Sequence, residues 1–219
     1  MTASKKFRRT LLLLPLTALM VLALQGCIEM AAVGIGAAAL SANDRRTTGA
    51  QVDDEGIELR ATNRVSERFG DKVHINVTSY NRSVLLTGEA PDEKTKAEIE
   101  KIVRDVASVR GVVNDLQVAG GSSLTARASD ATITGKVKAR FFDANRFNGL
   151  YVKVVTEASV VYLMGIVTEA EANEAVEIAR TTGGVRKVVK VFDFCKPSDP
   201  ACLPRADKPK AEEAKKSGS

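Results

Sequence analysis

The feature that most constrains the fold is a long internal repeat. A strand-like apolar segment that ends in glycine occurs twice, 77 residues apart, and the segments on either side of it recur with a spacing of 76 residues. Because solenoid repeats usually recur within ~20–50 residues, a period of this length predicts two complete copies of one small domain. The paired segments are Asp54 and Ile57 with Asp130 and Ile133, 84–88 (VLLTG) with 161–165 (VYLMG), and 109–113 (VRGVV) with 185–189 (VRKVV).

Each copy has the pattern helix, strand, strand, helix, strand. Apolar residues four apart predict the first helix, alternating apolar and polar residues predict the first strand, and Asn81-Arg82 predicts a hairpin turn. Pro91 is expected to open the second helix, and 112–118 to form the closing strand. The apolar positions of copy one are Ile57, Ala61, Val65 and Phe69, then Val73, Ile75 and Val77, then Val84 to Leu86, then Ile99, Ile102, Val103 and Val106. Copy two repeats them at Val137 and Phe141, Val152 to Val155, Val160 to Val167, Ala172 to Ala179 and Val188 to Phe194.

We therefore expect an α+β fold with two tandem α-β-β-α-β domains, residues 54–120 and 121–195. Each domain should hold a small three-stranded mixed sheet covered by two helices. Domains of this size lie near the lower limit for an independent hydrophobic core.

The N-terminus is typical of a secretion signal over residues 1–26. Basic residues up to Arg9 precede an apolar run, 11–24, of only fourteen residues. The alternative, a transmembrane anchor, fits poorly, because fourteen helical residues span roughly 21 Å and a bilayer core is ~30 Å thick. Removal of Lys5, Lys6, Arg8 and Arg9 with the leader lowers the net charge from +5 to +1, so charge gives no argument for a nucleic-acid partner.

The segment Leu24-Gln25-Gly26-Cys27 resembles the bacterial lipoprotein box. That resemblance implies diacylglyceryl and acyl (palmitate-type) modification of Cys27, and several chains hold a protein firmly on a membrane. Ile28 stands where Asp would favour retention at the inner membrane, so the outer membrane is the expected location, on its periplasmic face. Residues 27–53 are interpreted as the lipidated N-terminus and a tether. The G-x-G-x-x-A match in 34–39 lacks a preceding strand and does not indicate dinucleotide binding.

The two copies resemble the BON domain family, through the step from apolar strand to glycine at Gly88 and Gly165 and the Gly184-Val185 pair before the last strand. The first copy has Ser108-Val109 in place of that pair. A lipoprotein box followed by two such domains is similar to dual-BON lipoproteins of Gram-negative envelopes. The resemblance implies a non-enzymatic protein that binds anionic phospholipid, supports outer-membrane integrity and lies partly at division sites. The alternative is an interaction scaffold that docks an outer-membrane assembly machine or a peptidoglycan-remodelling machine.

The first helix of the second copy is the candidate lipid site. At 100° per residue Phe142 lies opposite the core-facing residues, and Lys138 and Arg146 flank it at i−4 and i+4. An exposed aromatic between two cations is typical of membrane docking, although single exposed apolar residues are common on protein surfaces. The BON resemblance implies that the same helix contacts lipid, which adds Thr132 and Gly135. Many family members carry an aromatic residue where this chain has Thr132, which weakens the expected affinity.

No catalytic, metal or cofactor site is predicted. His74 is the sole histidine and is interpreted as a solvated strand residue, and no nucleophile motif accompanies it. The acidic run from Glu169 to Glu177 is interpreted as a solvated helix face.

Cys195 and Cys202 enclose a short loop containing two prolines. In an oxidising periplasm we expect them to form a disulfide that contributes about 2.5 kcal/mol at most. Residues 196–219 are assigned to this loop and to a tail rich in Lys, Glu, Ala and Pro, which is predicted to be disordered and could reach peptidoglycan.

Overall fold

The computed structural model describes residues 44–203. The predictions for the leader, for lipidation at Cys27, for most of the tether and for the C-terminal tail therefore fall outside the described residues. Within the described part, no helix is long and apolar enough to cross a bilayer.

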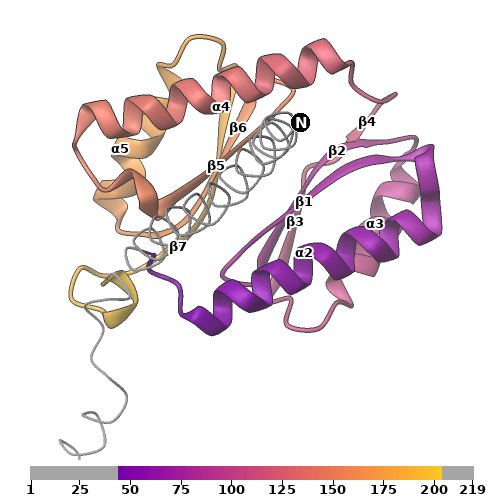
Figure 1. The fold of residues 1–219 in the computed structure, drawn as a ribbon, viewed down its shortest axis with the longest axis horizontal. Coiled ribbons are helices and arrows are strands. Elements are labelled where there is room, and N and C mark those ends of the chain that lie inside the picture. Colours follow the sequence, from indigo (N-terminus) through magenta and orange to yellow (C-terminus); the bar gives the residue numbers. More distant parts are fainter. Residues whose placement is uncertain (1–43, 204–219) are drawn as a thin grey trace, which may run out of the picture. The chain divides into compact units, whose positions relative to one another are not determined.

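The first repeat is an α-β-β-α-β unit (Figure 1). Residues 48–53, which were expected to belong to the tether, form the first turns of its first helix. Its elements are α2 (Thr48–Phe69), η1 (Gly70–Lys72), β1 (His74–Tyr80), β2 (Ser83–Ala90), α3 (Glu93–Arg104), β3 (Gly111–Asn114) and β4 (Gln117–Val118).

The second repeat has the same order of elements and ends in a short 3₁₀ turn. Its elements are α4 (Leu124–Ala144), η2 (Gly149–Tyr151), β5 (Val152–Glu157), β6 (Val160–Val167), α5 (Glu169–Arg180), β7 (Lys187–Phe194) and η3 (Pro200–Cys202). The α+β fold with two tandem domains is thereby confirmed.

Both sheets are mixed, with the second strand in the centre. In the first domain β2 pairs antiparallel with β1 and parallel with β3, and in the second β6 pairs antiparallel with β5 and parallel with β7. In each domain two helices pack on one face of the sheet, and a separate apolar cluster lies between sheet and helices. In the first domain that core includes Ile57, Val65, Leu86 and Val103.

Two local expectations were wrong. The closing strand expected over 112–118 is divided into β3 and β4, because the Asn114 side chain accepts a hydrogen bond from the Leu116 amide and Leu116 turns into the core. The sheet of the first domain consequently has four strands rather than three. Pro91 does not open α3. It precedes the N-cap Asp92, whose carboxylate accepts a hydrogen bond from the Thr95 amide.

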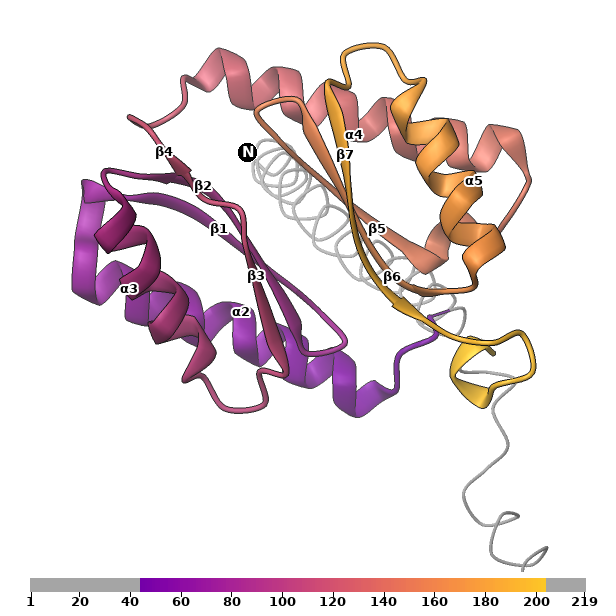
Figure 2. The ribbon, with the colours of Figure 1, turned by 180° about the vertical axis from the view of Figure 1, so that it is seen from behind.

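The two sheets pack against each other through the faces that the helices leave uncovered (Figures 1 and 2). Tyr80 and Leu85 of the first domain form one buried cluster with Tyr162, Met164 and Ile166 of the second. Polar contacts surround this cluster, so the seam between the domains is apolar at its centre and hydrogen-bonded at its edges. These polar contacts join Lys153 to Glu58 (3.0 Å), Asn76 to Glu157 (2.8 Å), Tyr162 to Asp115 (2.7 Å) and Arg110 to Asp193 (2.5 Å).

Candidate functional site

Helix α4 has one face in the core and one face in solvent. Ile133, Val137 and Phe141 are buried on the inner face, as the helical periodicity predicts, and Asp130 is buried there as well. The Ser123 hydroxyl caps the N-terminus by accepting a hydrogen bond from the Ala126 amide, and Asn145 ends the helix in the left-handed conformation (φ 47°).

The outward face carries a straight apolar line. Leu124 is 81% exposed and Phe142 is 57% exposed. These two residues are eighteen positions apart, which is five full helical turns, so they lie on the same side about 27 Å from each other. Arg127 and Lys138 are exposed along one edge of this side, and the residues between Leu124 and Phe142 are small and exposed: Ala128, Ala131, Gly135 and Ala139. We call Leu124, these four residues and Phe142 the α4 line.

The sequence-predicted lipid residues are only partly brought together. Lys138 is exposed and lies beside the α4 line, one turn before Phe142. Gly135 lies within the line, and a side chain at that position would enter open space. Thr132 is exposed at the edge of the line, and its hydroxyl donates a hydrogen bond to the Ala128 carbonyl oxygen (2.9 Å).

Arg146 does not flank Phe142 on the helix. Because α4 ends at Ala144, Arg146 lies beyond the last turn, and its guanidinium pairs with Glu174 of α5 (2.9 Å). A second cation, Arg140, donates hydrogen bonds to the Ile178 carbonyl and the Thr182 hydroxyl. Lys138 and Arg127 are therefore the exposed cations beside the α4 line, whereas Lys136 lies about 120° around the helix from Leu124 and Phe142.

The expectation that His74 is a solvated strand residue was wrong, because its side chain is half-buried and paired. Its Nδ1 lies 2.8 Å from the Glu89 carboxylate, which is buried. No group of three or more His, Cys, Asp or Glu side chains within residues 44–203 is arranged to hold a metal ion.

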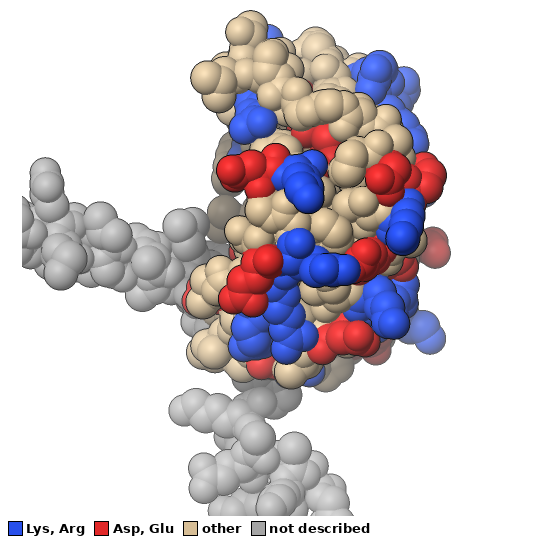
Figure 3. Space-filling model, turned by 90° about the vertical axis from the view of Figure 1, so that its right-hand side faces the viewer, with Lys and Arg blue, Asp and Glu red and all other residues tan. Residues whose placement is uncertain are grey.

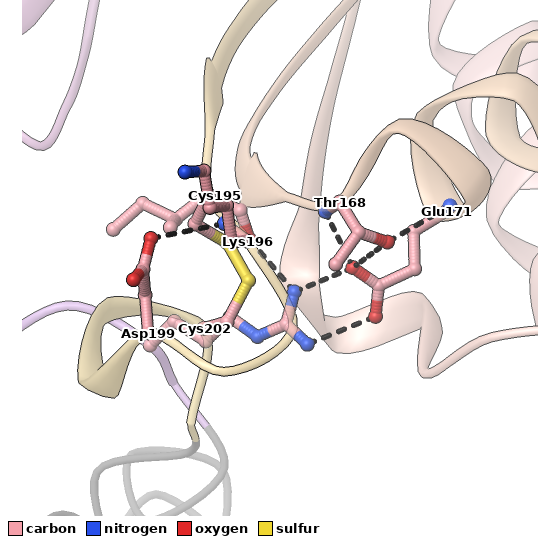
Figure 4. The surroundings of a disulfide bond; sticks show 8 residues. Thr168, Glu171, Cys195, Lys196, Asp199 and Cys202 are labelled. Carbon is pink, nitrogen blue, oxygen red and sulfur yellow. Dashed lines mark hydrogen bonds and ion pairs between the residues drawn. A yellow bond between two sulfur atoms is a disulfide. The ribbon is translucent and has the colours of Figure 1, made fainter.

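Cys195 and Cys202 form a disulfide, with their Cα atoms 5.7 Å apart. Figure 4 shows this bond beside Thr168 and Glu171 at the start of α5. The amide of Cys195 donates to the Val167 carbonyl, so the disulfide loop continues directly from the sheet. The expectation that Glu171 belongs to a solvated acidic face was wrong, because its side chain is 18% exposed and binds Arg45.

Sequence reasoning also missed the role of the repeated aspartates. Asp54 accepts hydrogen bonds from the amides of Asn81 and Arg82, at the turn between β1 and β2. Asp130 accepts in the same way from the amides of Ala158 and Ser159. The repeat spacing of these two carboxylates, one at each first helix, was the signal that could have found them.

A family model for the BON domain matches residues 53–120 and 129–196. The chain belongs to the BON-domain family. Outer membrane lipoprotein DolP of Haemophilus influenzae is 38% identical over 173 residues, which covers 78% of this chain and 90% of that protein. The 21 kDa hemolysin of Actinobacillus pleuropneumoniae is 31% identical over 153 residues (69% and 79%). Osmotically-inducible protein Y of Escherichia coli is 28% identical over 141 residues (63% and 70%).

The two BON domains and the identity to DolP over most of both chains make this a dual-BON protein of the DolP type. On the side of the BON pair seen in Figure 3, acidic and basic side chains are interspersed rather than gathered into a patch of one sign.

Proposed function

We propose that this chain is a non-enzymatic outer-membrane lipoprotein, anchored through Cys27, whose second BON domain binds anionic phospholipid through α4 and thereby supports the integrity of the envelope. The α4 line is the observation that carries the proposal. A helix whose outward side presents Leu124 and Phe142 on one line, with Lys138 beside it, can lie flat in the headgroup region of a bilayer. The similarity to a protein named as an outer-membrane lipoprotein supports the location.

The energies are those of a weak, selective contact. Burial of an exposed Leu or Phe side chain contributes about 1.5–3 kcal/mol, and each lysine close to an anionic leaflet adds about 1 kcal/mol. Because α4 alone would bind weakly, the acyl chains on Cys27 would hold the domain at the membrane and α4 would select the lipid. Enrichment at division sites follows if anionic lipid is concentrated there.

A second candidate function is the interaction scaffold, and a different surface favours it. Val52 and Leu59 are each 64% exposed and lie two turns apart on the same side of α2. This pair belongs to the first domain and is a candidate contact for an outer-membrane assembly machine or a peptidoglycan-remodelling machine.

Vesicle flotation tests the lipid-binding candidate. The chain without its leader, with Cys27→Ser so that no acyl chain contributes, is mixed with vesicles with and without phosphatidylglycerol. We expect selective binding to the anionic vesicles and at least tenfold weaker binding for Phe142→Ser and for Leu124→Ser. Leu59→Ser is the matched control, since it removes a similarly exposed apolar side chain from the equivalent helix.

Lys138→Glu should weaken binding to anionic vesicles only, because it acts through charge. Equal binding by wild type and Phe142→Ser would refute the proposal for α4. Loss of binding on Leu59→Ser instead would move the membrane contact to the first domain.

A further inference from the structure

Arg45 occupies a binding site on the second domain, although it precedes the first domain in the chain. Its guanidinium lies 3.7 Å from the centre of the Tyr151 ring and forms two hydrogen bonds to the Glu171 carboxylate, at 2.7 and 2.9 Å. A third hydrogen bond reaches the Ile166 carbonyl oxygen at 2.9 Å. The Arg45 side chain is 7% exposed. An aromatic face, a carboxylate that accepts two parallel bonds and a carbonyl together suit the planar guanidinium group.

The domain itself holds each part of this site in place. Tyr151 belongs to η2, Ile166 to β6, and Glu171 to the first turn of α5, where its carboxylate also accepts a hydrogen bond from the Thr168 amide in a capping box. Burial alone would raise the pKa of Glu171, but the hydrogen bonds from Arg45 and Thr168 outweigh it and the pKa is lowered. The carboxylate is thus charged and oriented toward the guanidinium.

The first repeat has no equivalent site. His74 stands at the position of Tyr151, and Thr95 stands at the position of Glu171. The adjacent Arg46 binds the first domain differently, with its guanidinium 4.3 Å from the Tyr80 ring centre and hydrogen-bonded to Asp44 and Asp54. Two consecutive arginines therefore fasten one short segment to two different domains.

We propose that the second BON domain carries a guanidinium-binding site formed by Tyr151, Ile166 and Glu171, and that Arg45 fills it in cis, so that the segment 44–47 latches the N-terminal end of the BON pair onto the second domain. This site is separate from the α4 line, and the proposal stands whether or not α4 binds lipid.

Native-state proteolysis of the full chain tests the latch. Trypsin cleaves after Arg46 only when the segment leaves its two binding positions, and mass spectrometry follows that cleavage specifically. We expect Glu171→Gln to speed it at least tenfold. Glutamine can still form the capping box, so α5 keeps its N-terminal cap while the charged acceptor is lost. Glu174→Gln is the matched control on the same helix, because its ion pair with Arg146 is largely exposed.

Arg45→Lys separates guanidinium recognition from simple charge attraction. Lysine keeps the positive charge but cannot form the two parallel hydrogen bonds, so we expect cleavage nearly as fast as in Glu171→Gln. The thermal midpoint is measured for each variant, and cleavage is compared well below it. Cleavage of Glu171→Gln at the rate of Glu174→Gln would overturn the latch, and wild-type protection in Arg45→Lys would overturn the assignment as a guanidinium site.

Discussion

Asp54 and Asp130 do the same structural work in the two domains, since each accepts hydrogen bonds from both amides of the hairpin turn in its own repeat. Both carboxylates are buried and come from the first helix of their repeat. Each contact fixes the position of the first helix relative to the hairpin of its own domain. It therefore joins two elements that local sequence patterns alone do not hold together.

Asp130→Ala should lower the free energy of unfolding by about 2–3 kcal/mol, because two turn amides lose a charged acceptor. Asp130→Asn should cost less, since one oxygen remains. Urea denaturation measures both variants. Asp143→Ala on the same helix is the control, and this exposed residue should change stability by less than about 0.5 kcal/mol. Equal stabilities for Asp130→Ala and its control would contradict this role.

The turn that Asp130 holds can be improved. Ala158 and Ser159 both have positive φ angles, 49° and 61°, which side chains other than Asn and Gly rarely adopt. Ala158→Asn combined with Ser159→Gly supplies the residues that a two-residue turn of this kind favours. We expect a gain of about 1–2 kcal/mol, seen as a higher thermal midpoint. A lower thermal midpoint would contradict this prediction and show that Ala158 or Ser159 makes a stabilising contact outside the turn.

Glu157, at the seam between the domains, should make the free energy of unfolding depend on pH. Burial raises the pKa of this carboxyl, against the hydrogen bond from Asn76, and the nearby Glu89 raises it further. The folded state therefore binds the proton more tightly than the unfolded state, so stability falls as pH rises through the folded pKa. Glu157→Gln should stabilise the protein at pH 7, and the gain should vanish below the unfolded pKa of about 4.3. Urea denaturation at both pH values checks this, and a gain that does not change with pH would contradict it.

The disulfide should act locally. Cys202→Ser opens a short loop, and we expect a loss of up to about 2.5 kcal/mol. Amide hydrogen exchange should accelerate in 196–203, while the strands of the second domain keep their protection. Ser198→Ala in the same loop serves as the control. Faster exchange throughout β6 would mean that the loop supports the whole sheet.

The sequence predicted most of the fold because the repeat and the local periodicities agree with each other. Val84, Ile133 and Phe141 were placed correctly in the core, and Phe142 was placed correctly outside it. Helix ends were harder. Arg146 was extrapolated along a helix that Asn145 terminates, and a left-handed Asn leaves little trace in an apolar pattern.

The packing of one domain on the other was not foreseen, although the sequence held a signal for it. A strand with one face in solvent alternates apolar and polar residues, but β6 is apolar along nearly its whole length, and Tyr162 and Met164 alternate with Val161 and Leu163. Such a run indicates burial on both faces. The Arg45 site left no comparable trace, because its members come from parts of the chain that only the fold brings together.

The shared cluster of Tyr80, Leu85, Tyr162, Met164 and Ile166 also bears on how such a repeat evolves. Each copy covers the sheet face that the helices of the other copy leave bare. A gene that loses either copy would therefore encode one domain whose apolar sheet face is open to water. Selection then acts on the pair rather than on each copy. The two sequences can diverge at their helices, where one copy has Val52 and Leu59 and the other has Ala128 and Gly135 at the same positions. The two domains, however, must stay together in one protein.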